Sequence, residues 1–200
     1  MTYITLDTES TGRKDGQICQ LALLMAQDGA VQGRNLYFAV DEMDEHAFAV
    51  HGLSKEALDT LSGGVRFADR AGELYALLAG ADLLVGHNIS SDVKALKAEF
   101  ARCGLDFAPR RTFCTMNRFT KEMGLPRRCG PGPKPPRLME LAAYFGLTEE
   151  EIASAAGEWF GGGDVAHDAR FDAAATWLCL ARSGVDPLAE VSSRPRSAMK

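Results

Sequence analysis

Residues 3–9 read YITLDTE, and their alternation of apolar and polar side chains predicts a β-strand with one buried face. Successive side chains of a strand point to opposite faces, so Ile4 and Leu6 should lie on one face and Asp7 and Glu9 on the other. Two carboxylates so close together repel, and one should take up a proton unless a cation lies beside them. The strand therefore predicts a cation site, although an acidic pair alone also suits an exposed strand end.

A second candidate site follows a short apolar run at residues 83–85, which predicts a buried strand. Residues 87–92 read HNISSD, and Ser90 or Ser91 can cap the helix that begins there. Asp92 then lies in the first helical turn, where the helix dipole favours an anion. Ligands gather beyond strand ends in covered sheets, so the segment predicts a binding site, with simple helix capping as an equal alternative.

The third candidate site lies at residues 167–172, which read HDARFD and follow three glycines at positions 161–163. On an ideal helix, side chains five positions apart are separated by about 140°, so they cannot share one face. His167 can meet Asp172 only from the loop or the first residue of the helix, and Asp168 is expected to cap that helix. The alternative for His167 is a surface histidine on a loop.

Together the three segments bring four carboxylates from one strand end and two helix starts: Asp7, Glu9, Asp92 and Asp172. An all-oxygen donor set suits Mg²⁺ or Mn²⁺ rather than zinc. Two such ions can activate a water and stabilise the leaving oxygen of a phosphodiester, and a nearby histidine can take the water's proton. The residues therefore predict metal-dependent phosphodiester chemistry.

The other segments predict an α/β protein. Strands are expected at residues 3–9, 18–25, 36–40, 83–85 and 112–115, and the turns between the first three are expected at Gly12, Gly16, Gly29 and Gly33. Apolar spacing predicts helices over residues 65–78, around 93–100, over 138–146, from the capping box of Thr148 and Glu151, and finally from the glycines to about residue 182. This order suits a ribonuclease H-like fold, with a mixed five-stranded sheet and helices on both faces.

Length and composition indicate which class of protein this is. The chain has 200 residues, of which 46% are apolar, enough for one domain with a substantial core. Apolar runs stay well short of the roughly 18 residues of a membrane span, and no signal leader opens the sequence, so we expect a cytoplasmic protein without a membrane partner. Five cysteines without a CxxC pair predict reduced thiols rather than disulfides or a zinc site.

Charge is distributed unevenly along this chain of net charge −5. Residues 110–137 contain eight basic residues and one acid, so they carry +7 and the remainder carries −12. Such a stretch can hold phosphates or can be a solvated charged face, and the two readings are equally favoured. Five of the eight prolines fall in residues 124–136, which predicts an exposed loop. Trp159 and Phe160 can stack on a base, although core packing suits the pair better.

Three quoted segments resemble the motifs of a known family: LDTESTG at 6–12, GHNISSD at 86–92 and HDARFD at 167–172. They are similar to the three motifs of the DEDDh group of DnaQ-like 3′→5′ exonucleases, nearest to the proofreading epsilon subunit of bacterial DNA polymerase III and its stand-alone relatives. The resemblance implies an exonuclease domain over residues 1–183. The remaining segment, residues 184–200, is expected to be a loosely ordered C-terminal tail.

The resemblance also implies a role for each motif residue. The catalytic set comprises Asp7, Glu9, Asp92 and Asp172, which would hold two Mg²⁺ or Mn²⁺ ions, and His167 as general base. The substrate-binding set comprises Ser10, Thr11, Gly12, His51, Leu53, His87 and Asn88. For His87 and Asn88, turn geometry and direct contact with substrate stay open. Ser91 departs from the family, which often has an aromatic residue there, and the insert at 124–136 is unusual.

These roles imply release of nucleoside monophosphates from a single-stranded or frayed 3′ end. DNA is favoured because the likeness is nearest the proofreading type, and a DNA polymerase is a candidate partner. Two alternatives stay open: an exoribonuclease of the same family, and a catalytically inactive nucleic-acid-binding or polymerase-associated module. An aspartyl-phosphate phosphatase is disfavoured, because Glu9 stands where such enzymes need a second aspartate.

Overall fold

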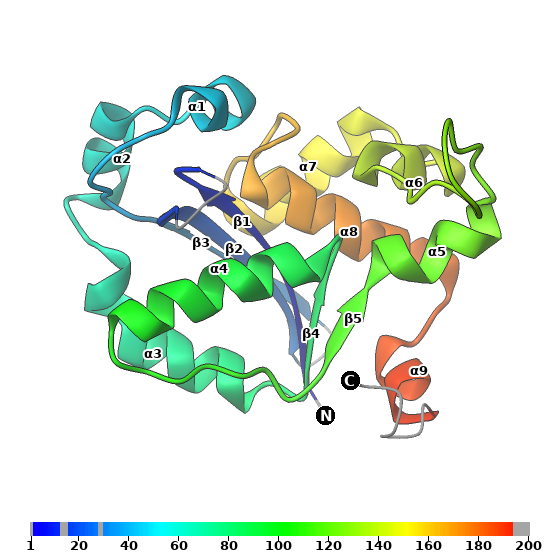
Figure 1. The fold of residues 1–200 in the computed structure, drawn as a ribbon, viewed down its shortest axis with the longest axis horizontal. Coiled ribbons are helices and arrows are strands. Elements are labelled where there is room, and N and C mark those ends of the chain that lie inside the picture. The colour runs from blue at the N-terminus through cyan, green and yellow to red at the C-terminus, as the bar shows by residue number, and fades with distance from the viewer. Residues whose placement is uncertain (1, 13–15, 28–29, 194–200) are drawn as a thin grey trace.

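A single mixed sheet organises the chain in the computed structural model, which describes residues 2–12, 16–27 and 30–193 (Figure 1). The strand order is β3-β2-β1-β4-β5. The strands are β1 (Tyr3–Ser10), β2 (Ile18–Gln27), β3 (Ala30–Tyr37), β4 (Leu83–Gly86) and β5 (Thr112–Cys114). The first three are antiparallel neighbours, while β4 pairs parallel with β1 and β5 parallel with β4. The predicted mixed five-stranded sheet is therefore confirmed.

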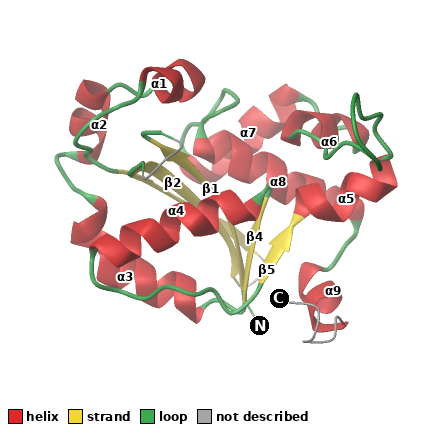
Figure 2. Ribbon diagram, in the orientation of Figure 1, coloured by secondary structure: helices red, strands yellow, loops and turns green. Residues whose placement is uncertain are grey.

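Helices cover both faces of this sheet, as predicted (Figure 2). On one face lie α3 (Phe67–Gly80) and α4 (Ile89–Arg102), and on the other α7 (Glu149–Phe160) and α8 (Ala169–Ser183). Ile4 and Leu6 join the core under α3 and α4, whereas the opposite side of β1 packs against α8. Within the described residues, none of the helices is long and apolar enough to cross a bilayer.

Shorter helices complete the structure. They are α1 (Glu45–His51) and α2 (Lys55–Ser62) after β3, α5 (Thr115–Met123) and α6 (Leu138–Tyr144) on either side of the proline-rich loop, and α9 (Pro187–Ser193). The predicted capping box of Thr148 and Glu151 begins α7. All five cysteines are free thiols, as expected from their spacing.

Several predicted boundaries are wrong. The third strand spans Ala30–Tyr37 rather than residues 36–40, because the chain leaves the ladder after Tyr37 and Ala39 donates its N–H to the Val65 carbonyl. Helix α4 begins after Asn88, whose backbone has a φ of 68°, so Ser90 and Ser91 lie inside its first turn instead of capping it. Gly29 lies outside the described residues.

The segment expected to be a loose tail begins with an ordered helix, α9. Arg118 Nε lies 2.6 Å from Glu190 Oε1, and Arg111 donates to Ser192 Oγ at 2.9 Å. Leu188 and Val191 pack against the buried ends of β4 and β5. Seven residues carry too little local signal to predict this helix, and its stability comes from tertiary contacts.

Gly33 lies inside β3 rather than in a turn, because α7 approaches the sheet there. A Cβ at this position would overlap the Trp159 carbonyl and the ring of Phe160. Trp159 packs beside Ala22 and Leu24, with its ring edge-on to Trp177 at 6.3 Å. These contacts favour the core-packing interpretation of the Trp-Phe pair over base stacking.

Gly33→Ala should therefore destabilise the fold by about 1–3 kcal/mol, because the added methyl group forces α7 away from β3. Gly72→Ala is the matched control: Gly72 is an exposed position of α3 with open space around a Cβ, and alanine there should stabilise by up to about 1 kcal/mol. Urea unfolding of both variants measures the difference, and equal stabilities would contradict this packing.

Candidate active site

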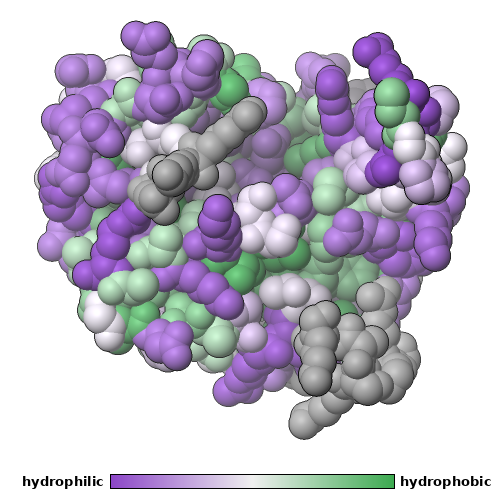
Figure 3. All heavy atoms as spheres, viewed as in Figure 1, coloured by the Kyte–Doolittle hydropathy of each residue, from purple (hydrophilic) through white to green (hydrophobic). Residues whose placement is uncertain are grey.

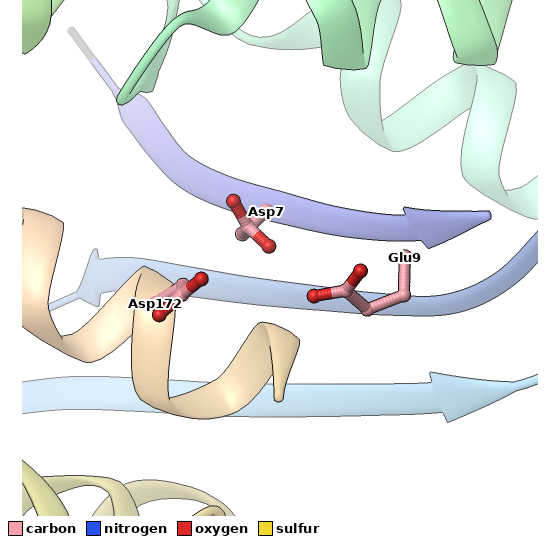
Figure 4. Close-up of side chains that lie close together, drawn as sticks. All are labelled: Asp7, Glu9 and Asp172. Carbon is pink, nitrogen blue, oxygen red and sulfur yellow. The ribbon is translucent and has the colours of Figure 1, made fainter. Parts of the chain in front are cut away.

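Three carboxylates converge where β1 meets the start of α8. One oxygen each from Asp7, Glu9 and Asp172 lies within 4.8 Å of the others. Figure 4 shows Asp7 and Glu9 on the same side of β1, pointing with Asp172 toward a common space. Strand alternation accounts for the first two, and α8 brings Asp172 in its first turn. The structure therefore brings together three of the four predicted metal ligands.

Asp92, the fourth predicted ligand, lies beside this group and outside the 4.8 Å set. It is buried in the first turn of α4, and its Oδ1 accepts a hydrogen bond of 2.8 Å from Thr8 Oγ1. Thr8 points to the α4 face of β1, opposite to its neighbours Asp7 and Glu9. Asp92 is still close enough for its charge to raise the pKa of both those acids.

Burial and mutual repulsion make ionisation of this cluster costly. Burial first, and then the charges of Asp172 and Asp92, raises the pKa of Glu9 to about 9. Burial raises the pKa of Asp92 to about 7 and that of Asp172 to about 6. The pKa of Asp7 is raised well above its usual range by burial and then by Asp92, Asp172 and Glu9.

This cluster fits divalent cations. The donors are carboxylate oxygens, which hard cations such as Mg²⁺ and Mn²⁺ prefer. A cation at the common space would remove the repulsion that raises the pKa of each acid. Exposed acidic groups often cluster without a metal, but Asp7 and Glu9 face a packed helix rather than open solvent.

His167 lies where the spacing of residues 167–172 predicted, in the loop directly before α8. It is exposed, and its backbone has the left-handed φ of 64°. Burial raises the pKa of Asp172, while electrostatic interaction with His167 and a backbone hydrogen bond from that residue lower it. Asp168 caps α8 by accepting from the Arg170 N–H at 2.9 Å, as expected. The histidine is thus held next to the acidic cluster.

Sequence reasoning missed a polar clamp that fixes this loop. Gln20 of β2 is fully buried, and its Oε1 accepts from the Ala169 N–H at 3.2 Å while its Nε2 donates to Asp168 Oδ1 at 2.9 Å. Arg170 Nη2 lies 2.6 Å from Asp168 Oδ2. The available signal was Gln20 itself, a lone amide in the apolar run ICQLALLM.

The glycines before His167 complete this clamp. A Cβ at Gly163 would overlap the Arg170 Cβ, and the backbone there has a φ of 96°, so this position requires glycine. A Cβ at Gly162 would meet only the guanidinium end of Arg170, which can move aside. Arg170 also lies over the ring of Tyr37, with its guanidinium carbon 5.8 Å from the ring centroid. The glycine segment before His167 is therefore held against Arg170, while His167 itself is exposed.

The predicted substrate-binding residues near the end of β1 bond mainly to one another. His51 Nδ1 accepts from the Leu53 N–H at 3.1 Å, so its Nε2 carries the proton and donates to the Ser10 carbonyl at 3.3 Å. Burial lowers the pKa of His51, which favours this neutral form. Thr11 Oγ1 accepts from the Gln17 N–H at 3.0 Å, and Ser10 Oγ donates to the Gly12 carbonyl at 3.2 Å.

His87 and Asn88 also have protein partners. His87 Nε2 donates to the Pro136 carbonyl at 3.0 Å, and Nδ1 lies 3.0 Å from Thr115 Oγ1. Asn88 Nδ2 donates to Ser91 Oγ at 2.8 Å, and Oδ1 accepts from the Ser90 hydroxyl at 3.1 Å. Of the two roles left open for these residues, these bonds favour turn geometry.

Comparison with known proteins agrees with this geometry. The family model described as Exonuclease matches residues 4–176. This chain belongs to the exonuclease family. The matched region of this exonuclease-family chain contains all of Asp7, Glu9, Asp92, His167 and Asp172.

Two relatives show how much of a longer protein this chain matches. The DNA polymerase III subunit epsilon of Salmonella typhimurium is 31% identical over 141 residues, which are 66% of this chain and 55% of that subunit. The 3′-5′ exonuclease DinG of Staphylococcus saprophyticus is 22% identical over 147 residues, 72% of this chain and 15% of that protein. The chain thus spans about half of the first relative and a small part of the second.

Solved structures of exonuclease I share the ribonuclease H-like fold. E. coli exonuclease I in complex with a dA16 oligonucleotide has a TM-score of 0.67 and 17% identity, covering 90% of this chain and 40% of that one. The zinc-bound form of the E. coli exonuclease I complex with single-stranded DNA has a TM-score of 0.70 and 17% identity, covering 95% and 42%. The predicted fold class is confirmed.

The raised pKa values predict how the metal-free protein responds to pH. An acid whose pKa is higher in the folded than in the unfolded state stabilises the fold below its unfolded value of about 4, and this contribution is lost as pH rises through the folded value. The folded-state pKa is about 6 for Asp172, about 7 for Asp92 and about 9 for Glu9. Thermal unfolding in EDTA should therefore show stability falling between pH 5 and pH 9.

Added Mg²⁺ or Mn²⁺ should raise the melting temperature more at pH 8 than at pH 5.5, because protons compete with the cation at low pH. Asp7→Asn removes an acid from the centre of the cluster, so its metal-free stability should depend less on pH than that of the wild type. Asp106→Asn, at an exposed position, is the control and should behave as the wild type. A metal effect that is equal at both pH values would contradict the predicted linkage.

Gln20→Leu should destabilise the protein by about 1–3 kcal/mol, because the Ala169 N–H and the Asp168 carboxylate lose a buried partner. Gln32→Leu makes the same exchange at an exposed position of β3 and should change stability by less than about 0.5 kcal/mol. Denaturant unfolding compares them, and similar losses in both variants would show that the clamp does not hold α8.

Proposed function

We propose that this chain is a metal-dependent 3′→5′ exonuclease that releases nucleoside monophosphates from 3′ ends. The observation that carries the proposal is the convergence of Asp7, Glu9 and Asp172 beside His167, in a chain of the exonuclease family. A catalytically inactive site that only binds nucleic acid does not need mutually repulsive acids next to a histidine. Their retention supports an enzyme over the inactive binding module.

The acidic cluster would hold the metal. Asp7, Glu9 and Asp172 are the direct ligands in this proposal, and Asp92, held by Thr8, completes the site for a second ion. Bound Mg²⁺ or Mn²⁺ would activate the attacking water and stabilise the leaving oxygen of the phosphodiester. One exonuclease I complex is described as zinc-bound, so a panel of Mg²⁺, Mn²⁺ and Zn²⁺ is the direct test of metal preference.

His167 is the general base in this proposal. It is exposed to solvent, lies beside Asp172, and is the histidine whose charge reaches that acid. His51 and His87 have both ring nitrogens engaged by protein groups, and His46 points to solvent on α1. An imidazole at the edge of the site can take the proton of the attacking water.

DNA is the substrate we favour, with a single-stranded or frayed 3′ end. The support is the likeness to a DNA polymerase subunit and to exonuclease I, whose solved complexes contain dA16 and dT13 oligonucleotides. A DNA polymerase is accordingly the candidate protein partner. Parallel digestion of 5′-labelled DNA and RNA of one sequence tests this preference, and faster cleavage of RNA would favour the exoribonuclease alternative.

Asp7→Ala should abolish the ladder of shortened products from 5′-labelled DNA in Mg²⁺, because the cluster loses a central ligand. His167→Ala should slow the reaction about 10²- to 10⁴-fold, the usual contribution of a general base. His46→Ala is the matched control, since it removes an exposed histidine that lies outside the cluster, and it should digest at the wild-type rate. Digestion that survives Asp7→Ala or EDTA would refute the proposal.

A further inference from the structure

A groove outside the acidic cluster separates α4 from α5. Its volume is about 650 Å³. Ser90 and Val93 of α4 line one side, Asn117 and Lys121 of α5 line the other, and Phe113 of β5 forms part of its floor. Figure 3 shows neutral and hydrophobic surface at the centre of this face of the molecule, with hydrophilic side chains around it. The groove thus combines apolar side chains, Val93 and Phe113 among them, with polar ones such as Ser90, Asn117 and Lys121.

The groove begins close to the acidic cluster. Ser90 lies in the same helical turn as Asp92, two residues before it. The carboxyl ends of the parallel strands β1, β4 and β5 lie at one edge of the sheet, and both α4 and α5 begin there (Figure 1). A ligand that leaves the cluster past the start of α4 therefore meets the groove next.

The positive charge beside α5 comes from those basic residues that have no acidic partner. Arg118 is paired with Glu122 and Glu190, Arg110 with Asp82, and Lys134 with Glu140. Lys121 is exposed, and no carboxylate among the described residues lies within ion-pair distance of it. The same holds for three exposed arginines of the adjoining segment: Arg127, Arg128 and Arg137. Half of the eight basic residues in 110–137 thus face solvent without an ion pair among the described residues, and of these four Lys121 lines the groove.

The start of α4 adds to this positive character. The helix has 14 residues, and its first turn carries the positive end of the helix dipole. The amide of Asn117 can donate a hydrogen bond from the α5 side, while the Ser90 hydroxyl across the groove already donates to Asn88 Oδ1. Phosphate oxygens are the acceptors that suit such a set of donors with a lysine at its rim.

We propose that this groove holds the backbone of the nucleic-acid strand directly 5′ of the nucleotide being removed, with Lys121 contacting a phosphate. The inference rests on the proposed exonuclease function and adds a second binding region to it. The contact is made to the backbone, so it is shared by DNA and RNA. It follows that affinity grows with strand length until the groove is filled.

The test compares Lys121→Glu with Lys97→Glu. Lys97 is exposed on the same helix as Ser90 and does not line the groove, so both variants change the net charge equally. The measured quantity is the ratio of kcat/KM for a 12-nucleotide strand to that for a dinucleotide. Lys121→Glu should lower this ratio at least five-fold, and Lys97→Glu should leave it unchanged. Equal ratios in the two variants would overturn the proposal.

Salt dependence gives a second readout. In an Asp7→Asn background, fluorescence anisotropy measures binding of the 12-nucleotide strand without cleavage. Each phosphate contact to a single strand contributes about 0.7 to the slope of log affinity against log salt concentration. The milder Lys121→Gln should lower the slope by about that amount on DNA and on RNA alike. An unchanged slope on both would remove Lys121 from the interface.

These outcomes separate the two proposals. Length-dependent binding that needs Lys121, without cleavage by the wild type in any metal, would retain the groove and reject the exonuclease. Normal cleavage with no difference between Lys121→Glu and Lys97→Glu would retain the exonuclease and reject the groove. Circular dichroism confirms that each variant is folded before either conclusion is drawn.

Discussion

Repulsion between partly buried carboxylates is the constraint around which this molecule is organised. Asp7, Glu9 and Asp172 are held close enough to oppose one another's ionisation, and Asp92 adds to the effect from the neighbouring helix. Repulsion of this kind weakens a fold unless the scaffold is rigid or a cation intervenes. The scaffold supplies rigidity through β1 at the centre of the sheet, where it is paired on both sides.

The two helices that complete the cluster are fixed in different ways. Helix α4 is tied to β1 by Thr8, and Glu99 near its other end accepts a 2.7 Å hydrogen bond from the Ile18 N–H. Helix α8 is tied to β2 by Gln20 through its cap. These three contacts join polar groups in largely buried surroundings, so they fix the positions of the helices more narrowly than apolar packing does.

Local pattern predicted the parts of the site that depend on local geometry. Strand alternation placed Asp7 and Glu9 together, and helical angle placed His167 in a loop with Asp172 one turn inside. It could not show that Thr8 would hold Asp92, since the two are 84 positions apart, or that Gln20 would reach Asp168, 148 positions away. The local sequence predicts a turn at Gly33, because the close approach of α7 to β3 leaves no trace in that sequence.

The hydrogen bond between His87 and the Pro136 carbonyl fixes the end of the proline-rich loop, so movement of the loop is not passed on to the acidic cluster. Lys134 and Glu140 form an ion pair beside that bond, so the loop is anchored at its last residues while its tip is free of the sheet. Residues 126–133 can therefore be lengthened, shortened or exchanged while Asp7, Glu9 and Asp172 stay in place. The loop is therefore a position at which a different surface segment can be inserted without altering the acidic cluster.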